Sequence, residues 1–119
     1  MENKVDAHAL MNDQMKAVLA KSAELAGSDA FATDAGFEGM RENYTKERKF
    51  WNEGGPVMAM TVDEMFDGPM GEFKVRFYYP VEAEKLPVIV FIHGGGFVVG
   101  NPDTHDRVCR ILAEKTGAA

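Results

Sequence analysis

A histidine followed by three consecutive glycines is the sharpest chemical signal in the sequence. The run is His93, Gly94, Gly95 and Gly96, and it lies between an apolar stretch and a predicted helix. Glycine has no Cβ atom, so such a loop can adopt unusual dihedral angles and turn its N–H groups toward a bound group at close range. Two chemistries use a loop of this kind. One cradles a phosphate, and the other holds the oxyanion of an acyl-transfer intermediate.

The phosphate interpretation is the weaker of the two. A dinucleotide site requires Gly-x-Gly-x-x-Gly leading straight into a helix, whereas here the apolar residues 97–99 separate the glycines from the helix N-terminus and its dipole. A Walker loop requires Gly-Lys-Ser or Gly-Lys-Thr, and no lysine lies between Lys85 and Lys115. A third interpretation is purely structural, because three glycines can also form a flexible connector after a strand.

The other residues capable of nucleophilic, acid–base or metal chemistry are few and lie apart. Ser22 lies inside an amphipathic helix and Ser28 in a turn at its end, so neither has the strand-to-helix turn that exposes a nucleophile. Cys109 lies in a predicted helix, where a small buried apolar role is favoured. We expect His8 to be exposed and His105 to be a structural hydrogen-bonding residue. The spacing of these groups predicts no metal site, no cofactor and no catalytic triad.

Helices are predicted for the first half of the chain. Apolar residues between 7 and 26 recur mostly every three or four positions, which marks one stripe of a helix, and Gly27 fits a helix stop. Residues 29–36 have the composition of a linker. A second helix is expected over 37–51, before the glycines and proline of 52–56 break it.

The second half changes to strand patterns. Residues 58–66 and 72–79 alternate imperfectly between apolar and polar side chains and flank turn residues at 67–71, which predicts an antiparallel hairpin. Residues 86–92 are apolar on both faces, which predicts a strand covered by helices on each side of a sheet.

A last helix is expected over residues 103–115. Pro102 suits its first turn, Asp103 with Asp106 resembles a capping arrangement, and Gly117 suits its end. Its buried face is expected to contain Val108, Ile111 and Leu112.

Composition favours one small soluble domain and excludes several classes of protein. The chain has 119 residues, of which 45% are hydrophobic and 27% charged. A net charge of −6 argues against nucleic-acid binding, which needs a basic surface. The longest apolar run, 88–92, is too short to cross a membrane. A single cysteine and the lack of a secretion signal predict a cytoplasmic protein.

Together with two flanking stretches, the glycine run resembles the oxyanion-hole loop of the hormone-sensitive-lipase-like α/β-hydrolases, most closely the bacterial acetyl esterases. The stretches are Tyr-Thr-Lys-Glu-Arg-Lys-Phe-Trp-Asn at 44–52 and Gly-Asn-Pro-Asp-Thr-His-Asp-Arg at 100–107. The resemblance implies the N-terminal part of an α/β fold, with cap helices, hairpin, third strand, oxyanion loop and first core helix. It divides the chain into a helical cap region, 1–55, and the start of the hydrolase core, 56–119. The helices of the cap region would be either plain core cover or a substrate lid.

The resemblance also implies an activity, the hydrolysis of short-acyl carboxylic esters by a serine carboxylesterase. The backbone N–H groups of Gly95 and Gly96 would then stabilise the oxyanion. The other roles that it implies are support of the loop by Gly94 and His93 and lining of the acyl side of the pocket by Phe97 and Val98.

The family's nucleophile lies on a Gly-x-Ser-x-Gly turn further along the chain, and the sequence ends before such a turn. The family's fourth strand, which lies between the second and third, would begin at 116–119, so the strand at 86–92 would expose unpaired apolar edges. We therefore expect the chain alone to be inactive and its partner to be the remainder of the hydrolase or a second copy. The alternative is a catalytically inactive fragment that acts as a binding or interaction module.

Overall fold

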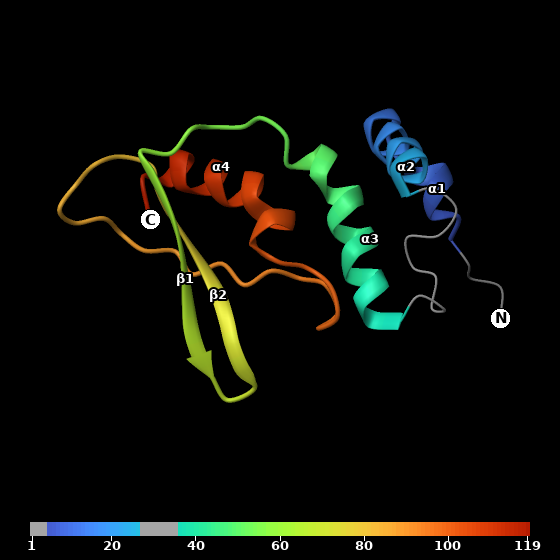
Figure 1. Ribbon diagram of the computed structural model, residues 1–119. Helices are drawn as coiled ribbons and strands as arrows, with labels where there is room; N and C mark the ends of the chain where they lie inside the picture. Colours follow the sequence, from blue (N-terminus) through green and yellow to red (C-terminus); the bar gives the residue numbers. More distant parts are fainter. Residues whose placement is uncertain (1–4, 27–35) are drawn as a thin grey trace.

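The computed structural model describes residues 5–26 and 36–119 (Figure 1). The predicted helix stop at Gly27 and nearly all of the linker at 29–36 lie outside these residues. The elements in chain order are α1 (Ala7–Leu10), α2 (Asp13–Ala26), α3 (Gly36–Trp51), β1 (Met60–Gly68), β2 (Gly71–Tyr79), the 3-10 helix η2 (Pro102–His105) and α4 (Asp106–Thr116). In Figure 1 the helices α1 to α3 lie at one end of the molecule, and the hairpin lies with α4 at the other.

The first predicted helix, over residues 7–26, is in fact two helices. The Asp6 carboxylate caps α1 by accepting a hydrogen bond from the His8 N–H at 3.1 Å, and the chain turns extended at Met11. The Asn12 side chain then accepts from the Met15 N–H at 2.8 Å and starts α2. Short polar side chains compete for backbone donors in this way, so the prediction of one continuous helix was wrong.

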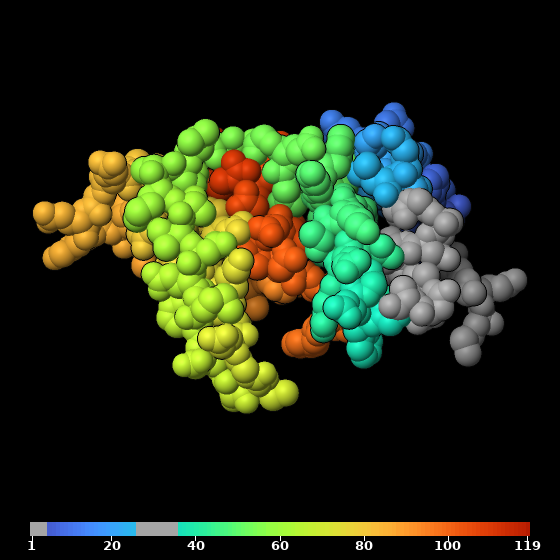
Figure 2. All heavy atoms as spheres, in the orientation of Figure 1, coloured from blue at the N-terminus to red at the C-terminus, as the bar shows by residue number. Residues whose placement is uncertain are grey.

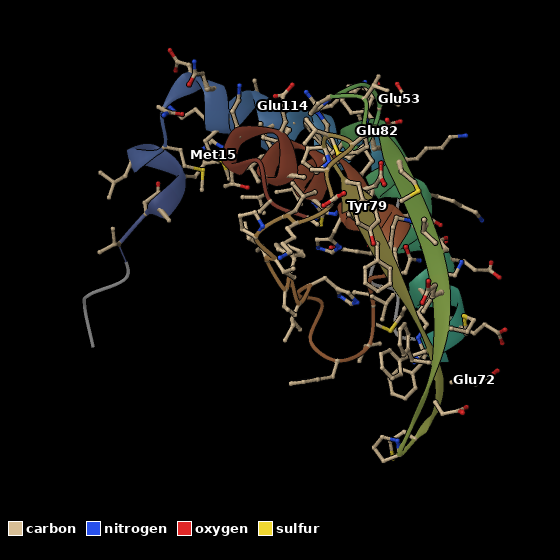
Figure 3. All side chains as sticks on the ribbon, turned by 90° about the vertical axis from the view of Figure 1, so that its left-hand side faces the viewer. Met15, Glu53, Glu72, Tyr79, Glu82 and Glu114 are labelled. Atoms are coloured by element: carbon tan, nitrogen blue, oxygen red, sulfur yellow. The ribbon has the colours of Figure 1, made fainter. Side chains whose placement is uncertain are left out.

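The predicted second helix and the predicted hairpin are both confirmed. Helix α3 begins one residue earlier than expected and ends at Trp51. Strands β1 and β2 pair antiparallel, from Met60 opposite Tyr79 to Gly68 opposite Gly71. Figure 2 shows the tip of this hairpin projecting from the body of the molecule, and Figure 3 shows Glu72 near that tip, pointing away from the other elements.

Residues 86–92 form no strand, contrary to the prediction of a buried one. Within the described part of the chain they pair with Ala119 alone, whose N–H donates to the Pro87 carbonyl and whose carbonyl accepts from the Ile89 N–H, each at 2.8 Å. This is the hydrogen-bond pattern of a parallel pair, but it lasts for one residue. One face of the segment is uncovered, with Val88 73% and Ile92 87% exposed, whereas Ile89 and Phe91 on the other face are 44% and 43% exposed. A strand of this composition needs sheet neighbours on its edges and helices on its faces, and the described residues supply only Ala119 at one edge and the His105 ring near Phe91.

The last helix begins differently from the prediction, with a turn of 3-10 helix. The Asn101 side chain accepts from the Thr104 N–H at 3.0 Å, and the Thr104 hydroxyl accepts from the Asn101 N–H at 2.9 Å, which is a reciprocal capping box. The expected cap of Asp103 with Asp106 was wrong. Both of these carboxylates bind Arg76 instead.

The end of the last helix is as expected, whereas its buried face is not. Gly117 ends α4 in the left-handed conformation, with φ at 67° and its N–H bonded to the Ala113 carbonyl. Ala113 is buried, but Val108 is 42% and Ile111 37% exposed, and Leu112 is half-buried. The exposed part of this face has no described apolar layer against it.

The core is small and lies beside the glycine loop. Helix η2 contacts α3, β2 and α4, so three separate parts of the chain meet at this short turn. Among the described residues, the buried apolar side chains are those of Tyr44, Tyr78, Val99, Ala113 and Ala118. One of them, Val99, belongs to the glycine loop itself, which fixes the loop to the core.

Candidate functional site

The glycine loop turns back on itself through one carbonyl group. The Gly95 carbonyl accepts hydrogen bonds from the Val98 N–H at 3.1 Å and the Val99 N–H at 3.0 Å. This turn places Gly95 at φ 142° and Gly96 at φ 60°, a region that other residues rarely occupy. No described residue accepts a hydrogen bond from the N–H of Gly95 or Gly96. These two donors are therefore free, within the described chain, to bind an oxygen atom.

At two positions in this segment only glycine fits sterically, and at a third position the backbone angle favours glycine. A Cβ atom on Gly95 would collide with the Val99 carbonyl, and one on Gly100 would lie 2.6 Å from Nδ1 of His93. Gly96 has open space around it, so what it contributes is its positive φ. Gly100 was not among the predicted site residues, although its position directly after an apolar stretch was a signal for close backbone packing.

The two histidines near the loop stack on each other. The rings of His93 and His105 lie 5.2 Å apart between centroids and 22° from parallel. His93 Nδ1 lies 2.8 Å from the Gly94 carbonyl, and His105 Nδ1 lies 2.9 Å from the Thr104 hydroxyl. Burial lowers the pKa of His105, and the neighbouring His93 and Arg48 lower it further, which favours an uncharged ring in the stack. Loop support by His93 and the structural role of His105 stay predictions.

Phe97 and Val98, the predicted acyl-side residues, lie at the outer turn of the loop. Phe97 is fully exposed and has a φ of 60°, a conformation that costs a bulky residue on the order of 1–3 kcal/mol. Val98 is half-buried, and its carbonyl accepts a 2.7 Å hydrogen bond from Nε of Arg41. The lining of an acyl pocket by Phe97 and Val98 stays a prediction.

The remaining candidate nucleophiles and ligands lie away from this loop in sequence. Ser22 lies within α2, Ser28 lies outside the described residues, and His8 is exposed on α1 as expected. Cys109 is half-buried on α4, where burial and the nearby Asp106 raise the pKa of its thiol and keep it protonated.

The described residues contain no cluster of three or more His, Cys, Asp or Glu suited to a metal ion. None of the described helices is long and apolar enough to span a bilayer.

A charged cluster on the other side of η2 was missed by the sequence analysis. Arg76 on β2 binds Asp63 on β1 through two hydrogen bonds of 2.6 and 2.8 Å. It also pairs with Asp103 at 2.8 Å and Asp106 at 3.3 Å, and Asp106 accepts from the Tyr78 hydroxyl at 2.9 Å. We call these five residues the Arg76 cluster. It ties the hairpin to the helix that follows the glycine loop. Part of the signal was present, because Asp63 stands directly opposite Arg76 in the hairpin register.

The Arg76 cluster is expected to weaken at acid pH. Hydrogen bonding and charge from Arg76 hold the pKa of Asp63 at about 2, below its ordinary value of 3.8. A carboxylate with a lowered folded-state pKa contributes stability above its unfolded pKa and loses it as the pH falls through the folded one. The protection factors of the β2 amides, which are exchange rates corrected for the intrinsic effect of pH, should therefore fall between about pH 4 and pH 2. The Asp63→Asn variant should lose this dependence, and parallel acid profiles for the two proteins would contradict the assignment.

The chain is similar to known esterases in sequence and in fold. Residues 89–119 match the family model described as the α/β-hydrolase fold. The acetyl esterase of Salmonella agona is 36% identical over 116 residues, which cover 98% of this chain and 35% of that protein. The hyperthermophilic esterase of the archaeon Pyrobaculum calidifontis superposes with a TM-score of 0.74 at 33% identity, over 91% of this chain and 34% of its own. A thermostable carboxylesterase from a metagenomic library gives a TM-score of 0.67 at 29% identity, over 74% and 30%.

The fold is thus that of part of an α/β-hydrolase domain, as the resemblance in sequence predicted. The chain is similar to acetyl esterases over nearly its whole length, and it spans about a third of the length of the curated relatives that it matches.

Proposed function

We propose that this chain is the N-terminal portion of a serine carboxylesterase that hydrolyses short-acyl esters, and that it supplies the oxyanion hole. The observation that carries the proposal is the pair of N–H groups at Gly95 and Gly96, which have no acceptor among the described residues, in a loop held between core and helix. The acetyl esterase activity named for the relatives supports the choice of an ester substrate. The lone cysteine favours a reducing compartment, so the proposal places the protein in the cytoplasm.

In this proposal the chain binds charge and leaves proton transfer to other residues. A serine attacks the ester carbonyl, and negative charge grows on the carbonyl oxygen. The N–H groups of Gly95 and Gly96 donate to that oxygen, and one such donor is typically worth about 3–4 kcal/mol of the barrier. Gly94 and His93 support the turn, and Phe97 and Val98 face the acyl group. The serine, acid and base come from a polypeptide segment with a Gly-x-Ser-x-Gly turn.

The proposal predicts that ester hydrolysis appears only when that segment is added. The 119-residue chain alone should not hydrolyse p-nitrophenyl acetate above background, because the attacking group is missing. A chimera in which this chain replaces the matching third of the Salmonella agona acetyl esterase should hydrolyse it, because the glycine loop then meets a serine. Initial rates of p-nitrophenolate release measure both.

The matched control is the same chimera with its nucleophilic serine replaced by alanine. A folded chimera without activity would contradict the proposed function. Turnover by the chain alone, blocked by an organophosphate that labels Ser22 or Ser28, would contradict the assignment of those serines as non-catalytic.

A second candidate function is that of an interaction module, in which the chain binds another polypeptide and has no catalytic role. The observation that favours it is the uncovered apolar segment 88–92, whose single parallel contact with Ala119 leaves most of its length unpaired. The mass of the native particle and the identity of any co-purifying chain separate the two candidates. A companion with a Gly-x-Ser-x-Gly segment supports the esterase.

A further inference from the structure

Helix α3 carries a row of polar side chains that bind the chain segment after the glycines. Arg41 donates to the Val98 carbonyl at 2.7 Å, and Thr45 accepts from the Asn101 side chain at 3.3 Å. Asn52, which directly follows α3, donates to the Thr104 carbonyl at 2.9 Å. We call Arg41, Thr45 and Asn52 the α3 stripe.

The geometry of the helix explains why these three side chains act together. Positions i, i+4 and i+11 lie on one face of a helix with 3.6 residues per turn, so the stripe faces in one direction. Its partners Val98, Asn101 and Thr104 follow one another at intervals of three residues. Figure 1 shows the same arrangement: the turn of the glycine loop, in orange, lies next to the first turns of α3. The stripe therefore meets the segment along its length, from the loop to η2.

Arg41 differs from the other two because it reaches the turn itself. Among the described residues, its side chain is the one that bonds a backbone atom of residues 95–99. The hydrogen bonds within this turn both end on the Gly95 carbonyl, and the neighbouring Phe97 is in a strained conformation. A turn with two glycines and one strained residue has many alternative conformations. A contact from outside the turn is needed to stabilise one of these conformations.

We propose that Arg41 is a positioning residue for the glycine loop, which it holds in shape by fixing the Val98 carbonyl. The inference rests on the proposed function, because the shape matters only if the N–H groups of Gly95 and Gly96 stabilise an oxyanion. Electrostatic stabilisation of this kind depends on donors that are already oriented when charge develops. Arg41 then acts on the reaction through the loop and touches no reacting atom. Helix α3 thereby helps to hold the glycine loop in its conformation.

Residue-resolved hydrogen exchange on the full chain tests the contact directly. Arg41→Met keeps the aliphatic stem and removes the donor, and Arg41→Lys keeps a donor. In the methionine variant the Val98 and Val99 amides should exchange roughly three- to tenfold faster, whereas the β1–β2 amides are unchanged. The lysine variant should restore most of the protection. Lys46→Met, which removes an exposed cation of the same helix, should change nothing at the loop.

Kinetics of the chimera separate positioning from substrate binding. Arg41→Met should lower kcat about tenfold with KM unchanged, and Arg41→Lys should recover most of kcat. Unchanged exchange at Val98 and Val99, or amides that are unprotected even in the unaltered chain, would overturn the proposal. A rise in KM with constant kcat would also overturn it, because it would place Arg41 on the substrate. An inactive chimera that carries the unaltered chain would instead refute the proposed function, while the exchange data would still decide the role of Arg41.

Discussion

Replacing Gly95 with alanine is expected to lower kcat of the chimera by about a hundredfold or more and to leave KM nearly unchanged. The added methyl group would collide with the Val99 carbonyl, and alanine is strained at a φ of 142°. The turn must therefore rearrange, which moves the N–H groups of Gly95 and Gly96. Loss of one oxyanion donor typically costs about 10²–10³ in kcat. Because these contacts strengthen only as charge develops on the oxygen, the loss appears in kcat rather than in KM.

The control for this substitution separates the collision from backbone strain. Gly71 in the hairpin turn has a comparable φ of 110°, but open space surrounds its Cβ position. Gly71→Ala should therefore reduce stability slightly and leave kcat unchanged. A Gly95→Ala chimera with normal kcat would remove Gly95 from the oxyanion hole.

The chain alone is expected to self-associate through residues 88–92. Five consecutive apolar side chains are exposed there, including Val90 at 81%, and one edge of the segment is unpaired for most of its length. Unpaired apolar edges of this kind bind other chains. Light scattering should give a mass that rises with concentration above the 13.1 kDa of one chain, with rapid amide exchange in the dissociated form.

Charge placed on the edge should oppose this association. Val90→Lys should return the particle toward the mass of one chain, because a lysine on an edge disfavours strand addition. Val57→Lys is the matched control, since Val57 is 90% exposed but lies between α3 and β1. A sharply monomeric chain with slow exchange across residues 88–92 would contradict the prediction.

Sequence alone predicted the elements whose causes are local. The hairpin followed from two alternating stretches around Pro69 and Met70, and the end of α3 followed from the helix-breaking residues 52–56. The end of α4 followed from Gly117, which adopts the expected left-handed conformation. The glycine loop itself stood out because its residue type dictates unusual backbone angles.

Features that depend on side-chain competition or on distant partners were not predictable in the same way. Asn101 rather than Asp103 caps the helix, and the Asp103 carboxylate pairs with Arg76, a partner on β2 that is distant in the sequence. The contact of Arg41 with the loop depends on the docking of α3 from far along the chain. The segment 86–92 has the composition of a strand but forms none, because a strand depends on neighbours that hydrogen-bond to it.

The long sequence separation between α3 and the glycine loop also fixes the order in which the molecule takes shape. The hairpin pairs residues that are close in sequence, whereas Arg41 and Val98 are 57 residues apart, and Asn52 and Thr104 are 52 apart. A chain loop of that length must be closed, at an entropic cost, before any of these contacts forms. We therefore expect the ribbon of β1 and β2 to assemble early and the glycine loop to acquire its form late. On mild heating the same order runs in reverse, so the site loses its shape while most of the secondary structure remains.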